Sequence, residues 1–380
     1  MAETDPIKLC VPDIGEDELS LTREVLQSGW LAHGPYNHKF EQAFADYIGV
    51  KHAISCNSCT SALFAAVDAL GIGGEVIVPS FSWVATANIV VTNGATPIFA
   101  DIDYDSCNID PAAIEAAITP HTEAIIPVHF GGQMADMDPI MAIAEKHGLA
   151  VIEDTAETIG GTYKGRQAGS IGIGCFSFFP TKNMTTGEGG MLTTNDDALN
   201  RKVRAMIAHG MDSTTFQREK AATPWYRNAV MAGHNFRMPN AAAAMGYVQL
   251  GKLDDMNARR RRHAERMIRG LEDIAGLDLP REQEDRQHVY QMFTAKLARD
   301  IDRDGFVRRL NEMGIGASVH FYPPIHEQEY YRKFPHMRPH DLSVTEDVAR
   351  RIVSLPMYPG LSDGQVDRII DSVRSALTAG

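Results

Sequence analysis

The sequence predicts an α/β protein with a mostly parallel central sheet, helices on both faces and a smaller α+β domain after it. Between about residues 50 and 196, short apolar runs rich in β-branched residues alternate with helical stretches, a pattern typical of a buried parallel sheet. A long helical pattern over residues 241–274 then leads into a region of different character. We therefore predict a large domain over residues 1–250 and a small domain over residues 251–380.

The individual elements follow from periodicity and from glycine or proline at their ends. Two amphipathic helices are expected first, over residues 14–28 and 37–47. The expected strands of the sheet are 75–79, 96–100, 124–128, 149–153 and 175–179, and the helices between them are 61–70, 83–91, 111–117 and 137–147. The small domain should contain a strand at 290–297, a helix at 303–313, a strand at 317–321 and a terminal helix at 363–376.

Composition excludes several classes of function. The 36 basic and 49 acidic residues give a formal charge of −13, which disfavours nucleic-acid binding because both surfaces would be negative. The N-terminus has no apolar signal region and no stretch is long enough to span a membrane. Five cysteines are few and odd in number, as is typical of a reducing compartment. We expect a cytoplasmic protein of enzyme size.

The segment with most chemical content is CFSFFPTKNMTTGEGGM, residues 175–191. Lys182 follows a buried strand and precedes a glycine-rich turn. A lysine partly removed from water near a strand end is a usable amine nucleophile. Taken alone, the segment is better explained as a surface lysine in a glycine loop.

Three further segments are candidates, and two of them follow predicted strands, where ligands of parallel sheets bind. Asp154 comes after the strand LAVIE and could pair with a pyridine nitrogen. An aspartate that caps a helix or forms a buried ion pair would give the same sequence pattern. The segment NSCTS, residues 57–61, precedes a helix and could bind phosphate. Trp83 lies in PSFSWVAT and could stack on a cofactor ring. No histidine pair or second CxxC accompanies Cys56 and Cys59, so no metal is expected.

Together these segments resemble the DegT/DnrJ/StrS family of sugar aminotransferases, which are fold type I enzymes that use pyridoxal 5′-phosphate (PLP). The resemblance covers nearly the whole chain. Its most discriminating parts are TKN…TGEGG and NFRM; others include GATPIFADID, VIEDTAE, GASVHFYPPIH and LPMYPGLS.

The resemblance implies a role for each matching residue. Lys182 would hold PLP as a Schiff base, Asp154 would pair with the ring nitrogen, and Trp83 would stack on the ring. The phosphate would be surrounded by Cys59, Thr60 and Ser177, together with Asn235 of the partner subunit. That last contact implies a homodimer with shared active sites. Separately, His320 and Tyr322 lie beside a Pro-Pro turn and are expected to line a substrate pocket, with packing at the end of a strand as the equal alternative.

Two positions depart from the usual family pattern. Cys59 stands where glycine is common in the family. The cysteine keeps the backbone N–H but lacks the conformational freedom of glycine. Glu157 stands where glutamine or histidine is frequent, and a carboxylate beside the cofactor's phenolic oxygen would require one of the two sites to hold a proton. Glutamate here resembles the perosamine-synthase-like members, which aminate C4 of a nucleotide-linked 4-keto-6-deoxy sugar.

The expected activity is transfer of an amino group from L-glutamate to such a ketosugar, with pyridoxamine phosphate formed between the two half-reactions. The alternatives are a 3-keto sugar acceptor, dehydration or β-elimination on the same fold, and a non-catalytic PLP-binding regulator. A dehydrogenase is set aside because no G-x-G-x-x-G joins a first strand to a helix. The run Arg259–Arg262 is expected to be a solvated helix face paired with Asp254, Asp255 and Glu265, with a substrate-diphosphate contact as the alternative.

Overall fold

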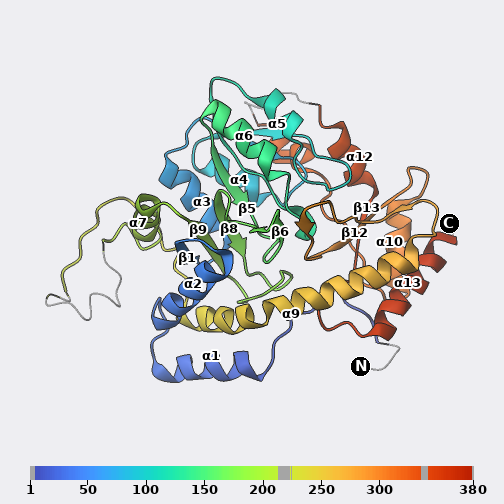
Figure 1. Cartoon of the computed structure of the whole chain (residues 1–380), viewed down its shortest axis with the longest axis horizontal. Coiled ribbons are helices and arrows are strands. Elements are labelled where there is room, and N and C mark those ends of the chain that lie inside the picture. Colours follow the sequence, from blue (N-terminus) through green and yellow to red (C-terminus); the bar gives the residue numbers. More distant parts are fainter. Residues whose placement is uncertain (1–4, 213–222, 224, 335–340, 379–380) are drawn as a thin grey trace.

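The computed structural model describes residues 5–212, 223, 225–334 and 341–378, and its largest element is a seven-stranded sheet (Figure 1). The strand order is β1-β9-β8-β5-β4-β2-β3. β9 runs antiparallel to both of its neighbours, and the other pairs are parallel. The strands are β1 (His52–Cys56), β2 (Glu75–Pro79), β3 (Thr96–Ala100), β4 (Thr122–Ile125), β5 (Ala150–Asp154), β8 (Ile173–Ser177) and β9 (Gly190–Thr194). The predicted fold class is confirmed.

Helices cover both faces of this sheet, because successive side chains of each strand point to opposite faces. In β2, Val76 and Val78 pack in the core under α3 and α4, whereas Ile77 packs in the core under α5 and α6. The covering helices are α2 (Pro35–Ile48), α3 (Cys59–Leu70), α4 (Ala85–Thr92), α5 (Pro111–Ala117), α6 (Met137–His147) and α7 (Asp197–Met206). The sheet is therefore buried on both sides, as its apolar strands predict.

The long helix α9 (Asn240–Leu271) joins the two parts of the molecule (Figure 1). It packs against α1 (Glu16–Ser28) and α2 near its start and against α13 (Asp363–Thr378) near its end. It runs without interruption through the boundary that we placed at residue 250. The domain limits remain a prediction.

The C-terminal part has its own core around an antiparallel sheet. The strands of this sheet are β10 (Leu277–Asp278), β12 (Phe293–Leu297) and β13 (Ile352–Leu355), and α10 (Arg303–Glu312) and α13 pack on it. The remaining elements are α12 (Ser343–Arg351), α11 (Glu329–Arg332), the short helices η1 (Phe130–Gly132) and η2 (Ile325–Glu327), and a small sheet of β11 (Arg286–Gln287), β6 (Thr162–Tyr163) and β7 (Arg166–Gln167).

The N-terminal segment belongs to this second core. Ile7 is fully buried in it and forms a bridge with Ile315. The amide of Met357 donates a hydrogen bond of 3.1 Å to the carbonyl of Leu9. The first residues of the described chain therefore pack with residues more than 300 positions later.

One expected strand is wrong. Within residues 317–321 only Ser318 pairs with another strand, in a bridge to Ser354. Pro323 and Pro324 have no N–H to donate, so a ladder cannot continue in this direction, and the segment turns toward the carboxyl ends of the large sheet. Among the described residues, no helix is sufficiently long and apolar to cross a bilayer.

Candidate active site

A cavity of about 490 Å³ lies at the carboxyl ends of β5 and β8 and at the N-terminus of α3. Such a volume is typical of small-molecule and cofactor sites. Eight of the ten predicted site residues line it: Cys59, Thr60, Trp83, Asp154, Glu157, Ser177, Lys182 and His320. Segments far apart in the sequence therefore meet at the edge of the sheet where ligands were expected.

Lys182 lies in a turn five residues after β8, where its backbone N–H donates to the carbonyl of Phe179. Its side chain is 16% exposed, and its Nζ donates a hydrogen bond of 3.2 Å to Oε1 of Glu157. The other oxygen of Glu157 accepts the amide N–H of Gly131 at 2.9 Å. The amine is thus mostly withdrawn from water and held beside a carboxylate.

Asp154 is the last residue of β5 and is buried. Its Oδ2 accepts a hydrogen bond of 2.9 Å from the hydroxyl of Thr86, and its Oδ1 accepts one of 3.2 Å from the amide of Ala156. Burial raises the pKa of the Asp154 carboxyl, and the two donors only partly offset this effect. A cation placed in the cavity would stabilise the ionised form.

The N-terminus of α3 closes one end of the cavity. Ser58 is the N-cap and accepts the amide of Ser61 through its hydroxyl. Cys59 and Thr60 form the first turn, whose N–H groups lack intrahelical acceptors and favour an anion. Burial raises the pKa of the Cys59 thiol well above its usual value, with Asp154 adding to the effect. Cys59 is therefore a neutral, buried thiol beside an anion site.

Two of the predicted residues lie outside the cavity lining. Tyr322 is 52% exposed, with the guanidinium of Arg303 4.5 Å from the centre of its ring. Asn235 is exposed, and its backbone bridges that of Ala208. His320, in contrast, reaches the cavity, and its Nδ1 lies 2.9 Å from the hydroxyl of Ser354. Burial lowers the pKa of His320, which favours a neutral ring.

The arginine run is only partly a solvated face. Arg259 pairs with Asp13 and Asp255, the latter as predicted. Arg260 is 1% exposed, so the interpretation of the whole run as solvated was wrong for this residue. The helix turns every 3.6 residues, and one member of a four-residue run therefore faces inward. None of the four arginines lines the cavity.

Sequence reasoning missed several residues of the cavity. Thr86 could have been found, because it lies in PSFSWVAT, the segment already singled out for Trp83; its hydroxyl lies 2.9 Å from that of Ser82. Others come from segments remote in the sequence. They include Leu9, Cys10, Gln291, Met292 and Ser354, together with Leu355 and Met357 of the segment LPMYPGLS.

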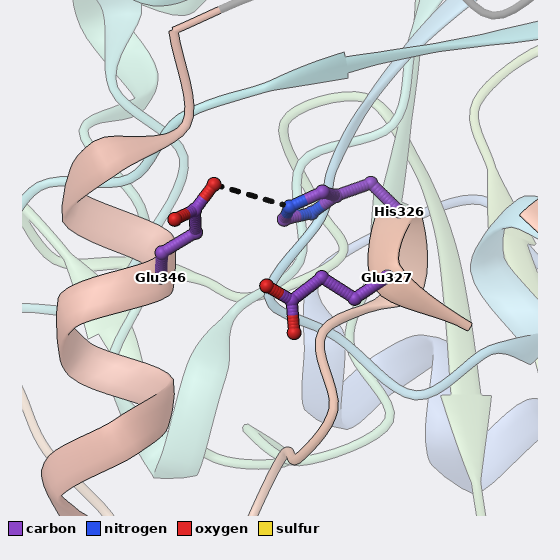
Figure 2. Close-up of side chains that lie close together, drawn as sticks. All are labelled: His326, Glu327 and Glu346. Atoms are coloured by element: carbon purple, nitrogen blue, oxygen red, sulfur yellow. Dashed lines mark ion pairs between the residues drawn. The ribbon is translucent and has the colours of Figure 1, made fainter. Parts of the chain in front are cut away.

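The segment that follows His320 is tied down by a polar cluster outside the cavity (Figure 2). His326 and Glu327, both on η2, face Glu346 of α12, and Nε2 of His326 lies 3.6 Å from Glu346. The three are close enough to share a cation, but Glu346 already pairs with Arg350 at 3.1 Å. Nδ1 of His326 lies 2.7 Å from the hydroxyl of Ser80, just after β2. The cluster thus anchors one wall of the cavity to the sheet.

The residues of the cavity suit PLP. A lysine amine, a buried carboxylate and a helix N-terminus match the aldehyde, the ring nitrogen and the phosphate of that cofactor, respectively. The exposed face of Trp83 at the cavity mouth offers a surface for a planar ring. Each of the groups that PLP requires is therefore available within one cavity.

Comparison with known proteins agrees with this geometry. The model of the DegT/DnrJ/EryC1/StrS aminotransferase family matches residues 12–374. The spore coat polysaccharide biosynthesis protein SpsC of Bacillus subtilis is 43% identical over 371 residues, covering 96% of this chain and 95% of that protein.

Solved structures show the same relationship. The aminotransferase TlmJ of Streptoalloteichus hindustanus is 32% identical, covers 98% of this chain and 99% of its own, and superposes with a TM-score of 0.91. Spr1654 of Streptococcus pneumoniae is known in a PLP form and a PMP form. Each form is 26% identical to this chain and superposes with a TM-score of 0.91. The match covers 98% of this chain and 99% of the Spr1654 chain.

Proposed function

The chain belongs to the DegT/DnrJ/EryC1/StrS aminotransferase family of PLP-dependent sugar aminotransferases, and we propose that it moves the amino group of L-glutamate to C4 of a nucleotide-linked 4-keto-6-deoxy sugar. The observation that carries the proposal is the amine of Lys182, held 3.2 Å from Glu157 in the cavity that also contains Asp154. Glu157 supports the C4 position, because glutamate at this place resembles the C4-aminating members of the family.

The cofactor would be PLP, held by Lys182 through its amine and by Asp154 at the ring nitrogen. Cys59, Thr60 and Ser177 would surround the phosphate, with the amides at the start of α3 as donors. When bound, PLP supplies a carbon that accepts the amino group and a ring that accepts the electron pair released at Cα of the donor.

The protein's own groups would move the protons. Nζ of Lys182 would remove the Cα proton of the amino donor and deliver a proton to C4′ of the cofactor, as general base and then general acid. The carboxylate of Asp154 would keep the ring nitrogen protonated. Because Asp154 is buried, its carboxylate would interact strongly with a cation in the cavity. Glu157 would accept a hydrogen bond from Lys182 and orient the amine between these steps.

The active unit would be a homodimer in the cytoplasm, with Asn235 of each subunit reaching the phosphate bound by the other. Two observations support this arrangement. Asn235 is exposed and outside the cavity of its own chain. Trp225, Tyr226 and Val230, a few residues earlier, are 75%, 63% and 60% exposed, and exposed apolar clusters of this kind mark interfaces.

The first experiment records the visible spectrum of the protein with PLP, before and after L-glutamate. We expect a yellow band that disappears with glutamate and returns with an acceptor sugar. Lys182→Ala should lose the band and nearly all turnover, because both the attachment and the proton transfer depend on Nζ; the latter alone is worth about 10²–10⁴-fold. Substantial turnover by this variant would contradict the role of Lys182.

The acceptor and the subunit arrangement need separate measurements. A panel of nucleotide-linked 3-keto and 4-keto sugars, with NMR of the product, identifies the carbon that receives nitrogen; amination at C3 would reject our assignment.

Mixing Lys182→Ala subunits with Asn235→Ala subunits tests shared sites, because a mixed dimer would contain one intact site. Activity that fails to return in such mixtures would exclude the sharing.

A further inference from the structure

The turn that carries Lys182 is held by side chains from outside the large sheet. The carbonyl of Thr181 accepts a hydrogen bond of 2.9 Å from Nε2 of Gln291, and the carbonyl of Lys182 accepts one of 3.4 Å from Nη2 of Arg260. The next side chain, Asn183, donates to Oδ1 of Asn257 at 2.7 Å. Gln291 precedes β12, whereas Arg260 and Asn257 belong to α9. Three consecutive residues are thus fixed from one side.

Arg260 is the most unusual of these groups. It is 1% exposed, it also donates a hydrogen bond of 3.1 Å to the carbonyl of Met357, which lines the cavity, and its guanidinium interacts with the thiol of Cys10. Among the described ion pairs, none joins Arg260 to a carboxylate, and its Nε has no hydrogen-bond partner. Burial lowers the pKa of its guanidinium to about 10. A buried cation without a carboxylate is destabilising, so simple stabilisation of the fold is a poor explanation for it.

The two carbonyls that accept from Arg260 come from separate parts of the molecule. One is on the lysine turn after β8, and the other follows β13 of the C-terminal sheet. A planar guanidinium can donate to both at once, which an ammonium or a single amide cannot do as well. The position of Lys182 is therefore coupled to α9 and to the C-terminal part through one side chain.

We propose that Arg260 is a positioning residue that holds the Lys182 turn so that the amine meets the cofactor, and that Gln291 supports the same turn through the carbonyl of Thr181. This inference rests on the proposed function, since it concerns the lysine that would hold PLP. Arg260 acts through the backbone of Lys182 and does not line the cavity.

The test compares Arg260→Gln, Arg260→Lys and Arg262→Gln in the full-length protein. Arg262 lies on the same helix and is exposed, so it is the matched control. For each protein, we would measure the dissociation constant of PLP by visible absorbance, and the rate at which borohydride traps PLP on Lys182 by mass spectrometry. Thermal unfolding without PLP reports the purely structural effect.

We expect Arg260→Gln to weaken PLP binding and to slow trapping by about tenfold, the size of one lost charged hydrogen bond. Arg260→Lys should fall between this variant and the wild type, and Arg262→Gln should match the wild type. A folded Arg260→Gln protein that binds and traps PLP within about twofold of wild type would overturn the proposal, whatever its unfolding temperature.

If Arg260→Gln does not fold, the variant Gln291→Leu tests the proposal by the same measurements. It removes the donor to Thr181 without leaving a buried charge unpaired, and slower trapping at Lys182 is the expected result. Trapping at the wild-type rate would overturn the proposal. A wild-type protein that never takes up PLP would instead contradict the proposed function, so the two failures are distinguishable.

Discussion

The two walls of the cavity differ in chemical character. The sheet wall, formed by the ends of β5 and β8 and the start of α3, contains Asp154, Glu157 and Lys182. The opposite wall, formed by residues 9–10, 291–292, 320–321 and 354–357, contains apolar or neutral polar side chains and a histidine whose pKa is lowered by burial. The difference suggests that the sheet wall performs proton transfer and that the opposite wall determines which substrate fits the cavity.

The largest effect should come from Asp154→Asn on the sheet wall. An amide cannot supply the negative charge that holds a proton on the ring nitrogen, so we expect turnover to fall by about 10²–10³-fold, as for loss of a preorganised electrostatic partner. PLP should still bind, because Lys182 is intact. Steady-state kinetics together with the absorbance spectrum measure both quantities. Turnover within a few-fold of wild type would remove Asp154 from the chemistry.

A smaller effect is expected from Thr86→Val, which removes the 2.9 Å hydrogen bond to Asp154. Loss of this donor raises the pKa of Asp154 further, so the carboxylate is protonated at higher pH and the acid limb of the rate profile should move upward in pH. Near neutral pH we expect a loss of about tenfold. Thr86→Ser retains the hydroxyl and should restore the profile; an unmoved acid limb would contradict this account.

Ser354→Ala tests the opposite wall. It removes the hydroxyl 2.9 Å from Nδ1 of His320, a neutral hydrogen bond worth about 1 kcal/mol. We expect KM for the acceptor sugar to rise by about fivefold with kcat nearly unchanged. If kcat falls and KM does not, the opposite wall takes part in the chemistry and our comparison is wrong.

Glu41→Gln, away from both walls, should leave turnover per folded molecule unchanged. Burial opposes ionisation of Glu41, but Arg204, His33 and the amide of Ser55 outweigh it and lower its pKa to about 2. Stability from this carboxylate is fully present above pH 4.5 and is lost as pH falls toward 2. Its pH-dependent contribution is on the order of 3 kcal/mol. Urea unfolding between pH 7 and 3 should show this dependence in the wild type only.

The comparison of the walls also shows what the sequence could predict. Strands β2 and β3 are predicted to the residue, because β-branched runs between glycine and proline leave few alternatives. The strand that ends at Asp154 and the strand that precedes Lys182 are also predicted, to within one and two residues, respectively. Local patterns and the rule that ligands bind at the carboxyl ends of parallel strands therefore mark Asp154 and Lys182 as candidates. The roles of these two residues, and the places of Glu157 and Ser177, are implied by the family resemblance.

Apart from His320, the rest depends mainly on contacts between segments that are remote in the sequence. β9 was missed because it begins at Gly190, where a Cβ would lie 2.3 Å from the carbonyl carbon of Ser58; glycine weakens a strand pattern. Arg260 was missed because a run of arginines predicts exposure. The opposite wall brings together residues from both ends of the chain, and only tertiary packing determines that meeting.

The pairing of Ile7 with Ile315 has a consequence for synthesis in the cell. Ribosomes add about 5–20 residues per second, so roughly 15–60 s separate the appearance of these two partners. During that interval the strands of the large sheet can already pair, whereas Leu9 and Cys10, which complete the cavity, must wait. We therefore expect the cavity to be the last part of a newly made chain to form, and the nascent protein to be unable to capture PLP until its C-terminal part has emerged.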